Sequence, residues 1–253
     1  NSVTVGKGAN SVSNNTVLGE NALDASVTGD HNTALGKDAL TTNTSGSKNN
    51  AVGFQALRLT TTGAKNNAMG YLALTENTTG ANNIGIGDEA LQNNTTANDN
   101  VAVGRQALKV NTTGFQQVAV GSNALDANTT GGNCTAIGMS ALSSNTEAND
   151  NTAVGYNALF SNTTAGNNTA VGRSALFANT TGIQNVALGS TALDANTTAS
   201  FNTAIGYAAM GATNTGSGNV AVGAYAMEAN TTGESNVSIG VNALEDNTTA
   251  SNN

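Results

Sequence analysis

A period of 17 residues runs through this chain and limits what it can fold into. The glycine that ends each Ala-Val-Gly-like triplet recurs without an insertion, at Gly19, Gly36, Gly53, Gly70, Gly87, Gly104, Gly121, Gly138, Gly155, Gly172, Gly189, Gly206, Gly223 and Gly240. Gly6 precedes Gly19 by only 13 residues, so we expect the first coil to be shorter or differently turned. A constant step means that each copy contacts its neighbours through the same geometry, because one stray residue would put every later copy out of phase.

The repeated unit reads Asn-(Thr/Val)-Ala-(Val/Ile/Leu)-Gly-x-x-Ala-Leu-x-x-Asn-Thr-Thr-(Gly/Ala)-x-x. Such a unit is too short for a pair of helices but suits one coil of a β-solenoid, which returns the chain above itself by about 4.8 Å. We therefore predict an all-β parallel β-solenoid, or β-roll, of about 15 coils. A single repeat domain is expected over 1–253, with 1–18 as an atypical first coil and 19–253 as regular repeats, the whole being a fragment of a longer fibre.

Composition narrows the classes of partner. Charged residues make up 9% of the chain and its net charge is -8, so no basic stripe is available to neutralise phosphates, and we expect no nucleic-acid partner. No apolar run approaches the roughly 20 residues that a membrane-spanning helix needs, so we expect no membrane insertion by this segment. The single cysteine, Cys134, cannot form an internal disulfide.

Strand alternation suggests how the chain associates. In Asn168-Thr169-Ala170-Val171-Gly172, Val171 and Ala170 point to opposite faces, and we assign the face of Val171 to the core. The opposite face then carries a small residue in nearly every copy, which predicts close packing against a neighbouring chain. We predict a homotrimer that packs through this alanine face, represented by Ala102, Ala119, Ala136, Ala153, Ala170, Ala187 and Ala204.

The rest of the coil carries turn and core signals. Leu176 is expected to fill the core from the other side of the coil. Asn-Thr-Thr-Gly, as in 179–182, has turn chemistry, because Asn and Gly tolerate left-handed backbone angles. Asparagines at the first repeat position are expected to form a hydrogen-bonded ladder, and they include Asn151, Asn168, Asn185, Asn202, Asn219 and Asn236.

These repeats resemble a known family. The segments Asn151–Gly155 and Asn202–Gly206 are similar to the Ser/Asn-Val-Ala-Ile-Gly repeats of trimeric autotransporter adhesin heads, which form β-rolls, although the period here is longer. The whole unit at 151–164 also resembles repeats of phage-type tail-fibre proteins. The resemblance covers nearly the entire chain and implies a trimeric, extracellular fibre that contacts a host or another surface.

No group of residues points to catalysis. The only histidine, His31, occupies a variable position and is expected to be a solvated turn residue. No His, Cys or Asp cluster has metal-ligand spacing, and the recurring aspartates fall in non-adjacent coils. Cys134 replaces the asparagine of the first repeat position and is expected to be a small filler. We predict that the chain is not an enzyme and has no cofactor or metal.

Paired threonines support an alternative. They recur at one place in the coil, as ice-binding solenoids arrange theirs, and form a candidate surface-contact row of Thr112, Thr113, Thr129, Thr130, Thr163, Thr164, Thr180, Thr181, Thr197 and Thr198. The same triplets are Asn-x-Thr acceptor sequences for N-linked glycans, for example at Asn111, Asn128, Asn179 and Asn230.

The sequence thus favours a structural or adhesive fibre segment. We expect an extracellular, cell-surface or virion-surface location, a homotrimeric shaft or head, and contact with a bacterial or host surface through a receptor or glycan. The alternatives are an ice- or surface-binding solenoid and a subunit of an extracellular filament that polymerises through open strand edges at its ends.

Overall fold

The computed structural model describes residues 4–8, 11–25 and 27–253, and every regular element in these ranges is a β-strand. The chain divides into two compact units, Asn1–Thr130 and Gly131–Asn253, which we call unit 1 and unit 2. The strands of unit 1 are β1 (Thr4–Gly6), β2 (Thr16–Gly19), β3 (Thr33–Leu35), β4 (Asn50–Val52), β5 (Asn67–Met69), β6 (Ile84–Ile86), β7 (Val101–Val103) and β8 (Val118–Val120). The strands of unit 2 are β9 (Thr135–Ile137), β10 (Thr152–Val154), β11 (Thr169–Val171), β12 (Val186–Leu188), β13 (Thr203–Ile205), β14 (Val220–Val222) and β15 (Val237–Ile239).

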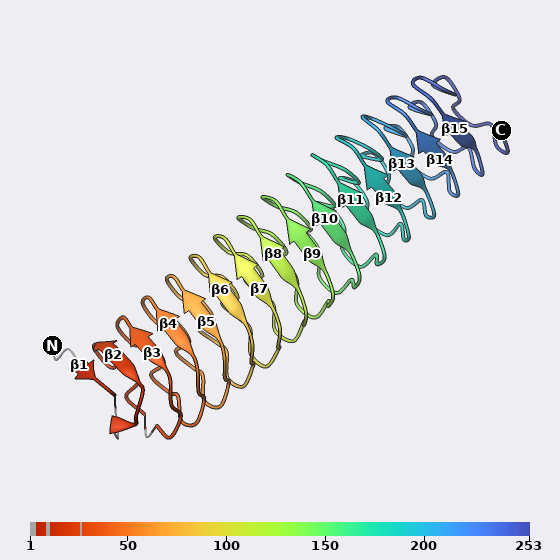
Figure 1. Ribbon diagram of the computed structural model, residues 1–253. Coiled ribbons are helices and arrows are strands. Elements are labelled where there is room, and N and C mark those ends of the chain that lie inside the picture. The colour runs from red at the N-terminus through yellow and green to blue at the C-terminus, as the bar shows by residue number, and fades with distance from the viewer. Residues whose placement is uncertain (1–3, 9–10, 26) are drawn as a thin grey trace. The chain divides into compact units, whose positions relative to one another are not determined.

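Each unit is a parallel β-solenoid. Within a unit, each strand from β2 onward pairs in parallel with the strand 17 residues further along the chain, as Thr152 with Thr169 and Val154 with Val171. Within each unit, successive strands therefore stack side by side in a sheet (Figure 1). The predicted fold class and the 17-residue period are confirmed.

The first strand departs from the repeat. β1 pairs antiparallel to β2, with Thr4 opposite Gly19 and Gly6 opposite Val17. The shorter spacing between Gly6 and Gly19 thus produces a reversal of direction rather than a shorter coil. Seven strands run parallel in each unit, and β1 is not one of them. The described residues therefore form fewer coils than the 15 that the sequence predicts.

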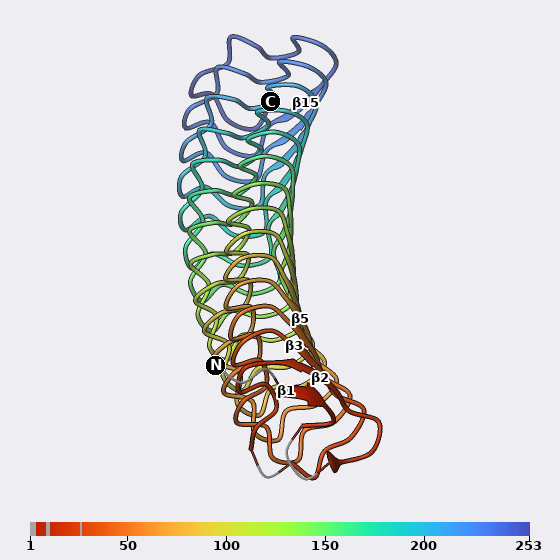
Figure 2. The same ribbon diagram turned by 90° about the vertical axis from the view of Figure 1, so that its left-hand side faces the viewer.

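Only one side of each coil forms a strand, but the opposite side also stacks on the next coil (Figure 2). The backbone N–H of Leu159 donates to the carbonyl of Ala175 at 3.0 Å, and the equivalent bond joins Leu176 to Ala192 at 3.0 Å. Backbone groups on both sides therefore find their partners in a neighbouring coil.

The turns use left-handed residues at positions that the sequence did not suggest. In one coil, Ser174, Leu176 and Gln184 have φ angles of 54°, 52° and 56°. Gly182, in the Asn-Thr-Thr-Gly segment, does not have a positive φ. The segment does bend at Thr180 and Thr181, and Nδ2 of Asn179 donates to the carbonyl of Gly182, but none of its residues is left-handed. The left-handed residues are instead the buried leucine, the residue two before it and the last residue of the repeat.

The glycine after each strand is required by the close approach of the coils. Gly172 has a φ of 138°, and a Cβ atom placed on it would lie 2.3 Å from the carbonyl oxygen of Gly189. No side chain fits at that distance, so the repeated glycine follows directly from the stacking.

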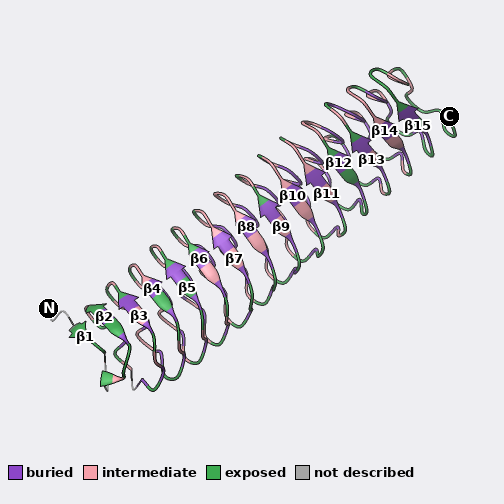
Figure 3. Cartoon of the chain, in the orientation of Figure 1, coloured by how far each residue is buried: buried purple, intermediate pink, exposed green. Residues whose placement is uncertain are grey.

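The core of each coil is thin and partly polar. It consists of the strand-centre alanine, the Ala-Leu pair and two asparagines, for example Ala170, Ala175, Leu176, Asn168 and Asn179, all of them 0% exposed. In the strands from β2 onward the buried residue lies between intermediate or exposed ones, as the colours of Figure 3 show. The prediction that the leucine fills the core is confirmed.

Candidate interaction surface

Each strand from β2 onward presents its first and third side chains to solvent. We call the surface that they form the strand face, and it has two rows. In unit 1 the first row is Thr16, Thr33, Asn50, Asn67, Ile84, Val101 and Val118, and the second row is Leu18, Leu35, Val52, Met69, Ile86, Val103 and Val120. In unit 2 the first row is Thr135, Thr152, Thr169, Val186, Thr203, Val220 and Val237, and the second row is Ile137, Val154, Val171, Leu188, Ile205, Val222 and Ile239.

The alanine row points the other way from the prediction. The alanines assigned to trimer packing are buried inside their own coil, since Ala102, Ala119, Ala136, Ala153, Ala170, Ala187 and Ala204 are all 0% exposed. The face of Val171, assigned to the core, is the half-exposed one. The sequence-based assignment of the two faces is therefore wrong.

Gly85 shows why the inward position is small. It takes the place of alanine in β6, and a Cβ atom placed on it would lie 3.2 Å from Cγ of Leu74 and 3.2 Å from the carbonyl oxygen of Ala90. The strand centre thus packs against the buried leucine of the preceding coil and the Ala-Leu side of its own coil. The space between the two sides admits a methyl group and little more, so the larger residue goes outside.

The strand face carries no charged side chain, and one of its two rows is apolar. Its second row is aliphatic, with Met69, Ile137 and Leu188 exposed by 54%, 41% and 45%. The protein nevertheless has a net charge of -8, and its ionisable groups lie elsewhere on the coils. A contiguous exposed apolar surface of this kind is typical of an interaction site.

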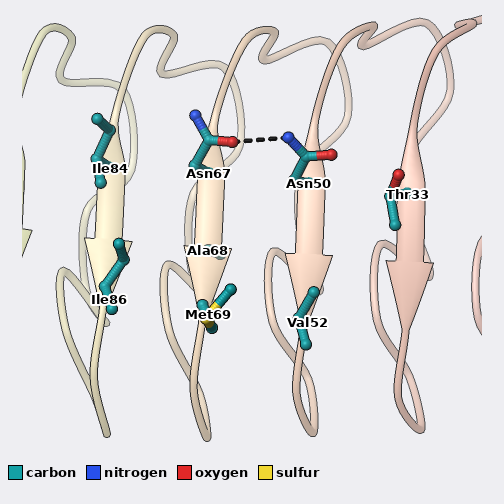
Figure 4. Close-up of a pocket in the computed structure, with 8 residues that line it drawn as sticks. All are labelled: Thr33, Asn50, Val52, Asn67, Ala68, Met69, Ile84 and Ile86. Carbon is teal, nitrogen blue, oxygen red and sulfur yellow. Dashed lines mark hydrogen bonds between the residues drawn. The ribbon is translucent and has the colours of Figure 1, made fainter.

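A recess interrupts the strand face of unit 1 over β3–β6 (Figure 4). It has a volume of about 380 Å³ and is lined by Thr33, Asn50, Val52, Asn67, Ala68, Met69, Ile84 and Ile86. Along its first row, Nδ2 of Asn50 donates to Oδ1 of Asn67 at 2.7 Å. The recess therefore combines an amide pair in one row with aliphatic side chains in the other.

Aromatic residues flank the strand face just beyond the glycine. Phe54 and Tyr71 stack with ring centroids 5.5 Å apart and remain 37% and 52% exposed. Tyr156 and Tyr207 occupy the same repeat position in unit 2 and are also exposed. These rings extend the apolar surface sideways from the second row.

The structure distinguishes the two threonines of each pair. Oγ1 of the first threonine donates to a backbone carbonyl of the next coil, as Thr112 does to Thr129 at 3.1 Å and Thr180 to Thr197 at 3.0 Å. The second threonine is exposed in Thr113, Thr130, Thr164, Thr181 and Thr198. One row of hydroxyls is therefore used to join the coils, and only the other row is available to a surface ligand.

Asparagines form two buried rows rather than one. At the first repeat position, Nδ2 of Asn168 donates to the carbonyl of Gly182 at 2.9 Å, and its Oδ1 accepts from the backbone N–H of Asn185 at 2.9 Å. The other asparagine row is formed by the asparagine of Asn-Thr-Thr. Nδ2 of Asn179 donates to Oδ1 of Asn162 at 2.9 Å and to the carbonyl of Gly182 at 3.0 Å. The repeated asparagine of Asn-Thr-Thr is the sequence signal for this buried row. It was missed because the same residues are also typical of a turn.

The asparagines of the glycan acceptor sequences belong to the buried Asn-Thr-Thr row. Nδ2 of Asn111 is inside the coil and donates to Oδ1 of Asn94 at 3.1 Å and to the carbonyl of Gly114 at 2.9 Å. Asn128, Asn179 and Asn230 are likewise 0% exposed. A sugar attached to these nitrogens is incompatible with the folded coil.

The ionisable groups do not converge. His31 is exposed and its Nδ1 lies 3.1 Å from a carboxylate oxygen of Asp30. Cys134 is buried, which raises the pKa of its thiol to about 11. In the described ranges, no three His, Cys, Asp or Glu side chains come together as a metal site would require. Nor do the described residues include a helix that is long and apolar enough to cross a membrane.

Comparisons with known proteins give no assignment. The chain matches no protein-family model, and no curated protein is significantly similar to it. A function for this chain can therefore be inferred only from its own residues and surfaces.

Proposed function

We propose that this chain is a structural and adhesive segment of an extracellular fibre, in which three copies associate side by side through their strand faces. In this role the chain supplies length and stiffness at a cell or virion surface and presents contacts to a receptor or glycan on a bacterial or host surface. The proposal assigns no reaction, cofactor or metal to it.

The strand face is the observation that supports association. An exposed aliphatic row on parallel strands is covered best by another surface with the same spacing, because side chains then meet coil by coil at about 4.8 Å intervals. A second copy of this chain offers such a surface, also without charge. The core of each coil is too thin to hold the aliphatic row, which is therefore exposed to water. Covering the strand face buries this row, and burial of apolar surface favours association.

Resemblance supports the rest of the proposal. The Asn-Thr-Ala-Val-Gly units are similar to repeats of trimeric adhesin heads and tail fibres, as at 151–155. We propose that the trimer packs through the strand face, because the alanine row is buried within each chain.

A charge placed on the strand face tests the proposal. Val171→Lys puts an ammonium group in the middle of the second row of unit 2, where association would bury it. We expect the association constant, measured by analytical ultracentrifugation, to fall at least tenfold. Thr181→Lys adds the same charge at an exposed position of the same coil and should leave association unchanged. A monomeric wild-type chain, or equal effects of the two variants, would contradict the proposal.

Ice binding remains the second candidate, because the exposed threonines of unit 2 align coil by coil. If Thr164, Thr181 and Thr198 bind ice, the wild-type chain should show thermal hysteresis, and Thr181→Lys should reduce it. An absence of hysteresis would remove this candidate without affecting the first.

A further inference from the structure

The repeat creates a difficulty for any association through the strand face. Because successive coils are nearly identical, two copies displaced by one coil would make almost the same contacts as two copies in register. Only positions that break the repeat can favour one alignment. The second row of the strand face distinguishes one coil from the next only weakly, because every one of its residues is aliphatic.

The first row of unit 1 does break the repeat. It reads Thr16, Thr33, Asn50, Asn67, Ile84, Val101 and Val118, polar at one end and aliphatic at the other. Two adjacent amides thus stand at the boundary, in β4 and β5, beside the recess of Figure 4. No other first-row position in the described strands carries an amide.

The amides are suited to pairing with copies of themselves. Asn50 Nδ2 donates one of its two N–H groups to Asn67 Oδ1, so outside this bond each amide keeps at least one N–H donor and one oxygen lone pair. Both residues are exposed in the single chain. A second copy in register places Asn50 opposite Asn50 and Asn67 opposite Asn67, and the remaining N–H of one amide can donate to the oxygen of its equivalent in the other chain.

A displaced copy loses this match. A shift by one coil places Asn67 opposite Ile84, where an amide covered by an aliphatic side chain has no hydrogen-bond partner. An antiparallel arrangement also places the polar end of the row against the aliphatic end. In coiled coils, a buried asparagine sets register and orientation for the same reason.

We propose that Asn50 and Asn67 fix the register in which copies of this chain associate, with like coils facing each other in parallel. The partner at the recess is thus a second copy of the chain, whose Asn50–Asn67 pair meets this one. This inference rests on the proposed association through the strand face and adds the element that selects one alignment.

Disulfide trapping measures the register. Chains carrying Val101→Cys are mixed with chains carrying Val118→Cys and oxidised mildly, and the disulfides are identified by mass spectrometry. Disulfides form best between cysteines whose Cα atoms are closest and within about 7 Å, so a rise in the fraction of 101–118 bonds reports a one-coil displacement. With Asn50 and Asn67 in place we expect 101–101 and 118–118 bonds. In Asn50→Val/Asn67→Val chains the fraction of 101–118 bonds should rise at least tenfold.

Controls separate register from folding and from association. Thr62→Val/Thr79→Val removes two exposed polar groups from the same coils, away from the strand face, and should keep the wild-type pattern. Valine already occupies the first row at Val101 and Val118, and circular dichroism checks that the asparagine variant folds. Should it not fold, Asn50→Thr/Asn67→Thr, with the residue of Thr33, should give the same displacement.

Three outcomes are decisive. Displaced disulfides that appear only in the asparagine variants support the inference. Trimers with the same disulfide pattern in wild type and variants overturn it while leaving the association intact. A monomeric wild-type chain overturns the association and this inference together.

Discussion

Leu176 illustrates how tightly single residues are constrained in this fold. Its φ angle of 52° is uncommon for a residue with a bulky side chain, yet the same position is left-handed throughout the regular repeats, from Leu23 to Leu244. The strain is offset by complete burial of the side chain and by a backbone bond to Ala192 at 3.0 Å. The leucine therefore faces the strand-centre alanine at close range.

Enlarging that alanine should destabilise the coil. Ala170→Leu forces extra methyl groups into a space that, at the equivalent Gly85, already brings Leu74 within 3.2 Å of an added Cβ. We expect a loss of about 1–3 kcal/mol in the free energy of unfolding, measured by denaturant titration. Val171→Leu, one residue away on the strand face, should change it by less than about 0.5 kcal/mol. Equal losses would mean that the inward side has room to spare.

The buried thiol gives a second prediction at this scale. Burial raises the pKa of Cys134 from 9.0 to about 11, because the coil interior disfavours the thiolate. Between these values the unfolded chain releases the proton and the folded chain keeps it, so stability falls as pH rises through this window. Relative to Cys134→Ala, the wild type should lose about 2–3 kcal/mol between pH 9 and 11. A thiol reagent should also react with Cys134 only after unfolding.

At the scale of elements, the asparagine row joins neighbouring coils through side chain and backbone together. Asn151 Oδ1 accepts the backbone N–H of Asn168 at 2.9 Å, while its Nδ2 donates to Ala165 at 2.9 Å. Cys134 occupies the preceding place in this row and offers sulfur to the backbone N–H of Asn151 instead. A thiol is a weaker partner than an amide for both bonds.

Restoring the amide should therefore strengthen this part of unit 2. In Cys134→Asn, the new Oδ1 accepts from Asn151 and the new Nδ2 reaches the carbonyl of Ala148, which the thiol now contacts at 3.4 Å. We expect a gain of about 1 kcal/mol in the free energy of unfolding. Cys134→Ser, which keeps the volume but lacks the reach, serves as the control. A gain in the serine variant as large as in the asparagine variant would show that reach does not matter.

At the scale of the whole molecule, the sequence predicts the period well and the orientation of the strand poorly. The constant step of the glycines requires like coils to stack, and Leu176 is recognisable as a core residue because its position holds a large apolar side chain, Leu or Met, in every regular repeat. Alternation separates Ala170 from Val171 but does not say which of them is inside. Which of the two is inside depends on how far the strand lies from Leu159 and Ala175 on the opposite side of the solenoid. The local sequence pattern does not give this distance.

A deletion series would test whether the repeat is truly the structural unit. Removing 152–168 joins Asn151 to Thr169 and keeps the sequence Asn-Thr-Ala-Val in phase, so unit 2 should lose one coil and fold otherwise unchanged. Removing 152–159 instead brings Phe160 to the start of the strand, deletes Leu159 and shifts Asn162 and Asn168 out of their rows. We expect the first variant to keep the β-sheet circular dichroism and protease resistance of the wild type and the second to lose both. Stacking of like coils as the basis of stability would be wrong if the shorter deletion were the better tolerated.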